Sequence, residues 1–133
     1  MSVTTKTGDK GQTRLFTGQS IAKDDLRVET YGTIDQLTAT IGMARAFAQN
    51  ARVKELLFQL QKQLGILMAD FASRGQEPMI TEEMLQSIEA EITNIEGSLP
   101  PLTKFLVPGE TKAEAFLDFA RTTARMAERR AWS

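Results

Sequence analysis

The sequence contains no histidine and no cysteine among its 133 residues. A Ser-His-Asp relay, a Cys-His pair and a zinc site with His or Cys ligands are therefore excluded within this chain. The lack of cysteine also excludes a disulfide framework, which fits a cytoplasmic protein. If the chain is an enzyme, its catalysis must come from carboxylates, arginine and lysine, backbone donors, or a cofactor that carries the reactivity itself.

A charge imbalance and long apolar runs are absent as well. The net charge is −1, which gives no reason to expect nucleic acid or a membrane surface as a partner. No apolar run approaches the ~20 residues of a membrane span, and the N-terminus lacks the apolar core of a signal peptide. The length suits a single domain over residues 1–133, and the 41% hydrophobic and 25% charged residues are ordinary for a globular protein.

Apolar residues recur at three- and four-residue steps through most of the chain after residue 25, which predicts helices. Either Asp24 or Asp25 is suited to cap the first helix. Thr111 and Glu114 form the sequence pattern of a capping box at the start of the last helix. The expected helices cover about residues 26–48, 51–73, 81–99 and 112–130.

No segment shows the two-residue alternation of a strand with any strength. The predicted fold class is therefore all-α, an antiparallel bundle of four long helices in residues 26–133. Phe105 lies at the centre of an apolar connector, residues 102–109, and a core anchor is the simplest interpretation of it. The side chains expected in the buried stripe of the last helix are Phe116, Phe119, Ala120, Thr123, Met126 and Ala127.

The N-terminal segment, residues 1–25, is polar and contains glycine. Residues 5–13 hold two glycines, three threonines and two lysines. Glycine lets backbone N–H groups approach an anion closely, and hydroxyl and ammonium groups add donors and charge. This composition predicts a polyphosphate-binding loop, although its spacing is not that of a Walker A loop. The alternative is a polar, flexible N-terminal tail.

A charged sector lies along the last predicted helix, opposite its apolar stripe. Arginine binds phosphate oxygens through two parallel hydrogen bonds, so this sector is a second candidate for phosphate binding. The alternative is a solvated helix face with Arg and Glu at i, i+3 and i+4 spacing. The sector consists of Glu114, Arg121, Arg125, Glu128 and Trp132, flanked by Arg129 and Arg130.

Two blocks of residues contain recognisable motifs, in order and over nearly the whole chain. The first block comprises Thr5-Lys6-Thr7-Gly8-Asp9-Lys10-Gly11, Gly18, Lys23-Asp24-Asp25, Tyr31-Gly32-Thr33-Ile34-Asp35-Gln36-Leu37 and Ile41-Gly42. The second comprises Lys104-Phe105-Leu106-Val107-Pro108-Gly109, Ala120-Arg121-Thr122 and Arg125-Met126-Ala127-Glu128-Arg129. Taken together, the two blocks resemble the signatures of the PduO-type cob(I)alamin adenosyltransferases.

The resemblance implies an enzyme that moves the 5′-deoxyadenosyl group of ATP onto the cobalt of cob(I)alamin and releases triphosphate. Cob(I)alamin is itself a strong nucleophile, so this chemistry needs no histidine or cysteine. The resemblance further implies Mg²⁺ bound to the phosphates, a homotrimer with active sites between subunits, a fifth helix in the family's bundle, and a reductase that supplies cob(I)alamin.

The same resemblance implies roles for individual residues. Asp35 and Arg121 match positions that pair as a salt bridge across the subunit interface, and Phe105 matches the aromatic residue at the lower face of the corrin. The ordinary alternative for Asp35 is a helix-face carboxylate. The expected catalytic set is Asp35, Phe105, Arg121 and Arg125. The ATP contacts implied by the resemblance are Thr5, Lys6, Thr7, Gly8, Thr13, Arg14, Lys23, Arg125, Glu128 and Arg129.

The chain also departs from the family pattern. Met126 replaces a usual second arginine, and Glu110 replaces a usual second glycine in the connector. Gln19, Gln36 and Thr38 replace a frequent Arg, Glu and Asn. These departures leave open a catalytically weak homologue that binds a corrinoid or nucleotide. A third interpretation is a helical interaction module, because the second and third helices carry regular apolar stripes.

Overall fold

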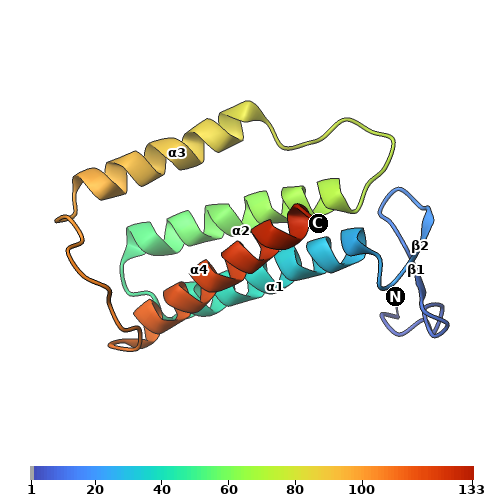
Figure 1. Cartoon of the computed structure of the whole chain (residues 1–133), viewed down its shortest axis with the longest axis horizontal. Coiled ribbons are helices and arrows are strands. Elements are labelled where there is room, and N and C mark those ends of the chain that lie inside the picture. The colour runs from blue at the N-terminus through green and yellow to red at the C-terminus, as the bar shows by residue number, and fades with distance from the viewer. Residues whose placement is uncertain (1) are drawn as a thin grey trace.

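The structure, a computed structural model, describes residues 2–133 as two short strands followed by four helices (Figure 1). The elements are β1 (Gln12–Arg14), β2 (Ser20–Ala22), α1 (Leu26–Phe47), α2 (Ala51–Phe71), α3 (Glu82–Gly97) and α4 (Lys112–Ala131). All four predicted helices are confirmed, with small shifts at their ends. None of these helices is long and apolar enough to cross a membrane. Met1, which begins the predicted N-terminal segment, lies outside the described residues.

The prediction of an all-α chain is wrong in one place, because residues 12–22 form a β-hairpin. The two strands pair antiparallel, with Gln12 opposite Ala22 and Arg14 opposite Ser20. Gly18 has a φ of 99°, which suits the left-handed region that glycine adopts without strain. Strands of three residues are too short for an alternation of apolar and polar residues to be recognised.

The helix N-termini form where the sequence supplies caps. Asp25, Asn50, Thr81 and Thr111 each accept a hydrogen bond from a backbone N–H in the first turn of α1, α2, α3 and α4. The capping box predicted for α4 is only half present, because Glu114 does not bond back to the N-cap. Its carboxylate accepts instead from the backbone N–H groups of Gly109 at 2.7 Å and Glu110 at 3.1 Å.

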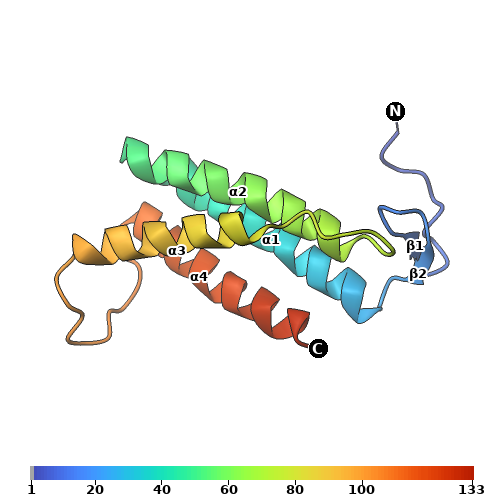
Figure 2. The same cartoon turned by 90° about the horizontal axis from the view of Figure 1, so that it is seen from above.

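The core lies where α1 packs between α2 and α4, as Figure 2 shows. Small residues allow α1 and α4 to approach closely, and Ala44 is fully buried. Of the side chains predicted for the buried stripe of α4, Phe119 is the exception, with 48% of its surface exposed. The buried residues of this core are Leu37, Ile41, Ala44, Leu57 and Ala120.

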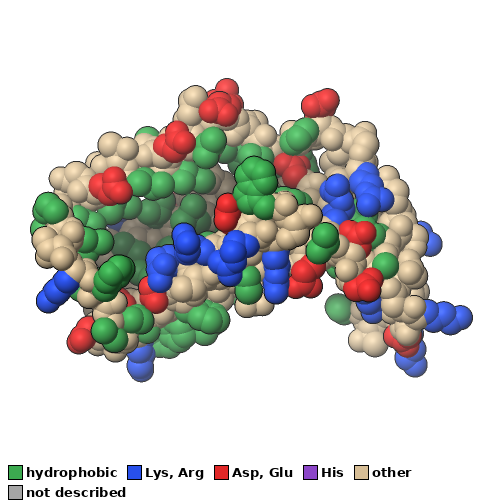
Figure 3. All heavy atoms as spheres, viewed as in Figure 1, with side chains coloured by type: hydrophobic (Ala, Val, Ile, Leu, Met, Phe, Trp, Pro, Cys, Tyr) green, Lys and Arg blue, Asp and Glu red, His purple; other side chains and the backbone are tan. Residues whose placement is uncertain are grey.

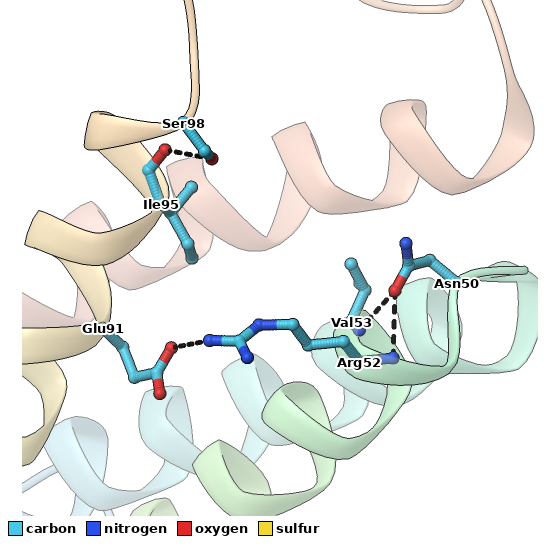
Figure 4. A network of polar contacts seen from close by, with 6 residues as sticks. All are labelled: Asn50, Arg52, Val53, Glu91, Ile95 and Ser98. Atoms are coloured by element: carbon cyan, nitrogen blue, oxygen red, sulfur yellow. Dashed lines mark hydrogen bonds and ion pairs between the residues drawn. The ribbon is translucent and has the colours of Figure 1, made fainter.

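Of the four helices predicted to form a bundle, α1 packs against α2 and α4, whereas α3 has no buried residue. An apolar groove separates α3 from α2, and Figure 3 shows a hollow lined by hydrophobic side chains on this side of the molecule. An ion pair between Arg52 of α2 and Glu91 of α3, at 2.9 Å, bridges the two helices (Figure 4). The carboxylate of Asp70 also accepts from the backbone N–H groups of Met79 and Ile80, just before α3.

Because the core is buried and α3 has no buried residue, a Leu→Ala substitution should lower the free energy of unfolding by different amounts in the two places. Leu57→Ala should lower the free energy of unfolding by about 2–5 kcal/mol, because it leaves a cavity in the core. Leu85→Ala should cost roughly half of that or less, because Leu85 of α3 is already 47% exposed. Urea unfolding followed by circular dichroism measures both. Equal losses would show that this face of α3 is covered in solution.

Candidate functional site

The N-terminal segment folds around a cavity of about 600 Å³ beside the hairpin. Its walls consist of hydroxyl side chains, one side-chain amide, the backbone of a glycine and two cationic side chains. No carboxylate lines it. Such a lining offers hydrogen-bond donors and positive charge to an anion. The lining residues are Thr5, Thr7, Gly8, Gln12, Thr13, Arg14, Ser20 and Lys23.

Turns within residues 5–11 shape one wall of the cavity. Lys6 has a φ of 62°, a left-handed conformation that costs a non-glycine residue ~1–2 kcal/mol. The hydroxyl groups of Thr5 and Thr7 lie 2.9 Å apart, within hydrogen-bond distance. The backbone N–H of Lys23 donates to the carbonyl of Gly11 at 2.9 Å, which closes the segment back onto itself. Residues in sparsely populated backbone regions cluster at binding sites, so the strain at Lys6 fits a ligand-binding loop.

Gly8 is required for the position of the Lys23 side chain. A Cβ atom at residue 8 would lie 2.8 Å from the Lys23 ammonium nitrogen and 3.2 Å from the carbonyl oxygen of Gln12. Real Cβ atoms do not approach other atoms so closely, so any side chain here would displace the lysine. The glycine therefore lets a cation lie directly against the backbone of the loop.

The two cations of the cavity are not neutralised by neighbouring carboxylates. Within residues 2–133 the ion pairs are Arg52–Glu91, Arg121–Asp118 and Arg130–Glu29. Arg14 and Lys23 take part in none of them, and both side chains are exposed. Their charges therefore remain available to an anionic ligand.

The structure brings together most of the residues predicted for the N-terminal half of the site. Of the seven expected in this segment, only Lys6 does not line the cavity. Gln12 and Ser20 also line the cavity, although no sequence signal identifies them. Alternate residues of a strand share one face, so Gln12 and Arg14 would have been linked if the hairpin had been recognised.

The charged residues of α4 do not reach this cavity within one chain. Arg121, Arg125, Glu128 and Arg129 are all exposed, and Figure 3 shows positively charged side chains gathered over the α4 region. Arg121 pairs with Asp118 at 2.9 Å, and Glu128 accepts from the indole N–H of Trp132 at 2.9 Å. The two predicted halves of the site are therefore separate in the single chain.

Arg130 differs from its neighbours in α4 because its side chain turns towards α1. Its guanidinium pairs with Glu29 at 2.9 Å and also donates to the hydroxyl of Thr33. The backbone carbonyl of Arg130 accepts from the hydroxyl of Thr30 at 3.1 Å. Arg130 thus fixes the end of α4 on the beginning of α1, a structural role.

Asp35 and Phe105 are both exposed to solvent. Asp35 lies on α1 and makes no ion pair within residues 2–133. Phe105 lies in the connector between α3 and α4, and its side chain is as exposed as in an extended chain, at 103%. The interpretation of Phe105 as a core anchor is therefore wrong, and its ring is free to contact a ligand or another chain.

The sequence of the chain is similar to those of known proteins. Residues 3–133 match a family described as cobalamin adenosyltransferase. The chain is 42% identical to the corrinoid adenosyltransferase PduO of Citrobacter freundii, over 98% of this chain and 40% of that protein. It is 40% identical to the corrinoid adenosyltransferase of Bacillus subtilis, over 98% of this chain and 70% of that protein. The chain thus spans less than half the length of the PduO protein.

The fold is also similar to that of solved structures. A variant of the PduO-type ATP:corrinoid adenosyltransferase from Lactobacillus reuteri, complexed with cobalamin and ATP, superposes with a TM-score of 0.90. The two sequences are 30% identical, and the match covers 98% of this chain and 76% of the other.

The contact between Gly8 and Lys23 can be tested by substitution. Gly8→Ala should weaken the binding of inorganic triphosphate about tenfold or more, because a displaced Lys23 loses a charge-assisted bond worth ~1.5–3 kcal/mol. Isothermal titration with inorganic triphosphate measures the dissociation constant. Gly65→Ala is the matched control, because nothing lies within 4 Å of a Cβ at that position on α2. Unchanged affinity in Gly8→Ala would contradict the role assigned to this glycine.

Proposed function

Because this chain belongs to the cobalamin adenosyltransferase family, we propose that it transfers the 5′-deoxyadenosyl group of ATP to the cobalt of cob(I)alamin. Triphosphate is the leaving group. The observation that carries the proposal is the cavity of the N-terminal segment, with two unpaired cations and several hydroxyl donors in its wall. These groups suit a triphosphate, and they lie in the segment that carries the first family signature.

The chemistry assigns a limited task to the protein. The electron pair of the reduced cobalt forms a bond to C5′ of the ribose, and the C5′–O bond breaks with its electrons going to triphosphate. No proton is transferred in this step, which is consistent with a chain that lacks histidine and cysteine. The side chains have to hold the triphosphate, align C5′ with the cobalt and stabilise the charge of the leaving group.

We assign the loop residues Thr5, Lys6, Thr7, Gly8, Thr13, Arg14 and Lys23 to ATP binding. The α4 residues Arg125, Glu128 and Arg129 complete the site from a neighbouring subunit of a homotrimer. This arrangement is supported by the exposure of these α4 side chains and by their absence from the cavity of their own chain. Arg121 would then exchange Asp118 for Asp35 of the neighbouring subunit.

Mg²⁺ fits this site only as an ion that enters with ATP. The cavity lining contains no carboxylate, and residues 2–133 contain no group of three acidic side chains that could hold a metal. Hard cations prefer oxygen ligands, which the phosphates supply. The hydroxyl groups of the cavity are the protein oxygens that remain for such an ion.

Phe105 is assigned to the lower face of the corrin. Its complete exposure supports this role, because the ring is available to another surface. Displacement of the axial base by this ring would leave four-coordinate cob(II)alamin, which is easier to reduce. A reductase partner would then supply the electron that gives cob(I)alamin.

The direct test is a transfer assay. The protein is incubated with ATP, Mg²⁺ and chemically reduced cob(I)alamin, and conversion to adenosylcobalamin is followed by absorbance. Conversion above a blank without enzyme is expected. Saturable binding of ATP or cobalamin without release of triphosphate would instead identify a catalytically weak homologue. If ATP and cobalamin both failed to bind, and neither raised the melting temperature of the protein, the interpretation as a helical interaction module would be favoured.

Arg125 tests the contribution of α4. Arg125→Ala should lower kcat/KM about 10²–10³-fold, because it removes a cation that stabilises the leaving triphosphate. Steady-state kinetics with varied ATP measures the effect. Arg52→Ala removes an exposed arginine that pairs with α3 and should leave the kinetics unchanged. Near-normal turnover in Arg125→Ala would contradict the assigned role.

Phe105 tests the corrinoid half of the reaction. Phe105→Ala should impair the reaction that starts from cob(II)alamin and a reductant more than the reaction with pre-formed cob(I)alamin. The reason is that the ring acts on the axial ligand before reduction. Parallel assays with the two starting oxidation states measure the difference. Equal losses in both would mean that Phe105 only shapes the binding surface.

A further inference from the structure

The C-terminal end of α2 is bonded to two other parts of the chain. The last carbonyl groups of a helix have no partner within that helix. Here three consecutive carbonyls, those of Phe71, Ala72 and Ser73, accept hydrogen bonds from outside α2. One nitrogen of the Arg27 guanidinium donates to Phe71 at 2.9 Å and to Ser73 at 3.2 Å, and the backbone N–H of Phe16 donates to Ala72 at 2.7 Å.

The middle carbonyl of the three connects the hairpin to the helices. Phe16 lies in the turn between β1 and β2, and its ring is 75% exposed, so its backbone makes the connection. A second bond runs from the backbone N–H of Arg74 to the hydroxyl of Thr17 at 3.0 Å. Leu15 and Ile21 are buried on either side of the turn. The hairpin that forms part of the cavity wall is therefore attached to the end of α2.

Arg27 is well placed to orient these carbonyls. It is the second residue of α1, and its own backbone N–H donates to the carboxylate of Asp25 at 2.8 Å. Its side chain is half-buried, and it forms no ion pair within the part of the chain that the structure describes. A cation at the C-terminus of a helix also interacts favourably with the helix dipole.

We propose that Arg27 is a positioning residue for the nucleotide cavity. By holding the carbonyls on either side of Ala72, its guanidinium keeps the Ala72 carbonyl directed at the Phe16 N–H. The hairpin, and with it the side chains of Gln12, Arg14 and Ser20, then stands at a fixed position relative to the helices. This inference rests on the proposed function in one respect, which is that the ligand of the cavity is ATP.

The test compares Arg27→Met with Arg74→Met. Both variants remove a cation at the same end of α2, but the Arg74 side chain makes no hydrogen bond or ion pair within residues 2–133, and its backbone bond to Thr17 remains. Arg27→Met should raise the KM for ATP about tenfold, with kcat at saturating ATP and the KM for the corrinoid little changed. Arg74→Met should leave all three constants unchanged, and Arg27→Lys should recover part of the loss because an ammonium group can donate to the same carbonyls.

Hydrogen exchange gives a readout that does not depend on catalysis. The amide of Phe16 should exchange faster in Arg27→Met than in the parent chain, while the amides of α1 around Ala44 keep their protection. Unchanged protection of Phe16 together with an unchanged KM for ATP would overturn the proposal. A lower kcat, higher KM values for both substrates and weaker protection throughout the core, all together, would also overturn the proposal. This combination would show a general structural role for Arg27.

The proposal can be separated from the proposed function. If the parent chain transfers no adenosyl group, the exchange experiment still reports on the attachment of the hairpin. Titration with inorganic triphosphate then replaces the kinetics. Weaker triphosphate binding in Arg27→Met than in Arg74→Met would uphold the positioning role, and equal binding would refute it.

Discussion

The packing of α1 between α2 and α4 is the interaction on which the other parts of the structure depend. Its buried face contains polar groups, because Thr30, Thr33 and Thr40 lie there beside apolar residues. The hydroxyls of Thr33 and Thr40 donate to carbonyls three or four residues earlier in α1, and the hydroxyl of Thr30 is shared between the carbonyls of Leu26 and Arg130. None of these hydroxyls is left without a partner in the core. The face can therefore contact two helices at once without a desolvation cost from these groups. The first turn of α1 also holds the end of α4 through Thr30 and the end of α2 through Arg27.

In the proposed function, the parts of the site are attached to different elements. The cavity for the anion is formed by the hairpin and the turns before it, which are bonded to the end of α2. The charged sector of α4 does not line that cavity, and Phe105 lies in a connector that is exposed throughout. In the proposed homotrimer, part of the binding energy for a large substrate would come from surfaces that meet only when chains assemble. The lack of histidine and cysteine is compatible with this design, because positioning and charge are all that the proposed chemistry requires.

The helices could be predicted because their signals are local. Caps such as Asn50 and a 3.6-residue period act over one or two turns, so a single sequence contains them in full. The hairpin could not be predicted, because its stability comes from burial of Leu15 and Ile21 and from bonds to α2, distant in sequence. Periodicity identified the apolar face of α3 but could not say what covers it. For the same reason the pattern predicts a buried Phe119 and does not identify Gln12 at the cavity, where its neighbours are set by strand pairing.

The hydrogen bond between Thr30 and Arg130 joins residues that are 100 positions apart in the sequence. Contacts of such separation form slowly, because the intervening chain must lose its freedom before they stabilise anything. The contact of α1 with α2 is formed by neighbouring helices joined by a short turn, and it can form early. On this basis we expect α1 to pair with α2 before α4 docks. During synthesis from the N-terminus, the hairpin and the end of α2 that holds it emerge from the ribosome before α4 does.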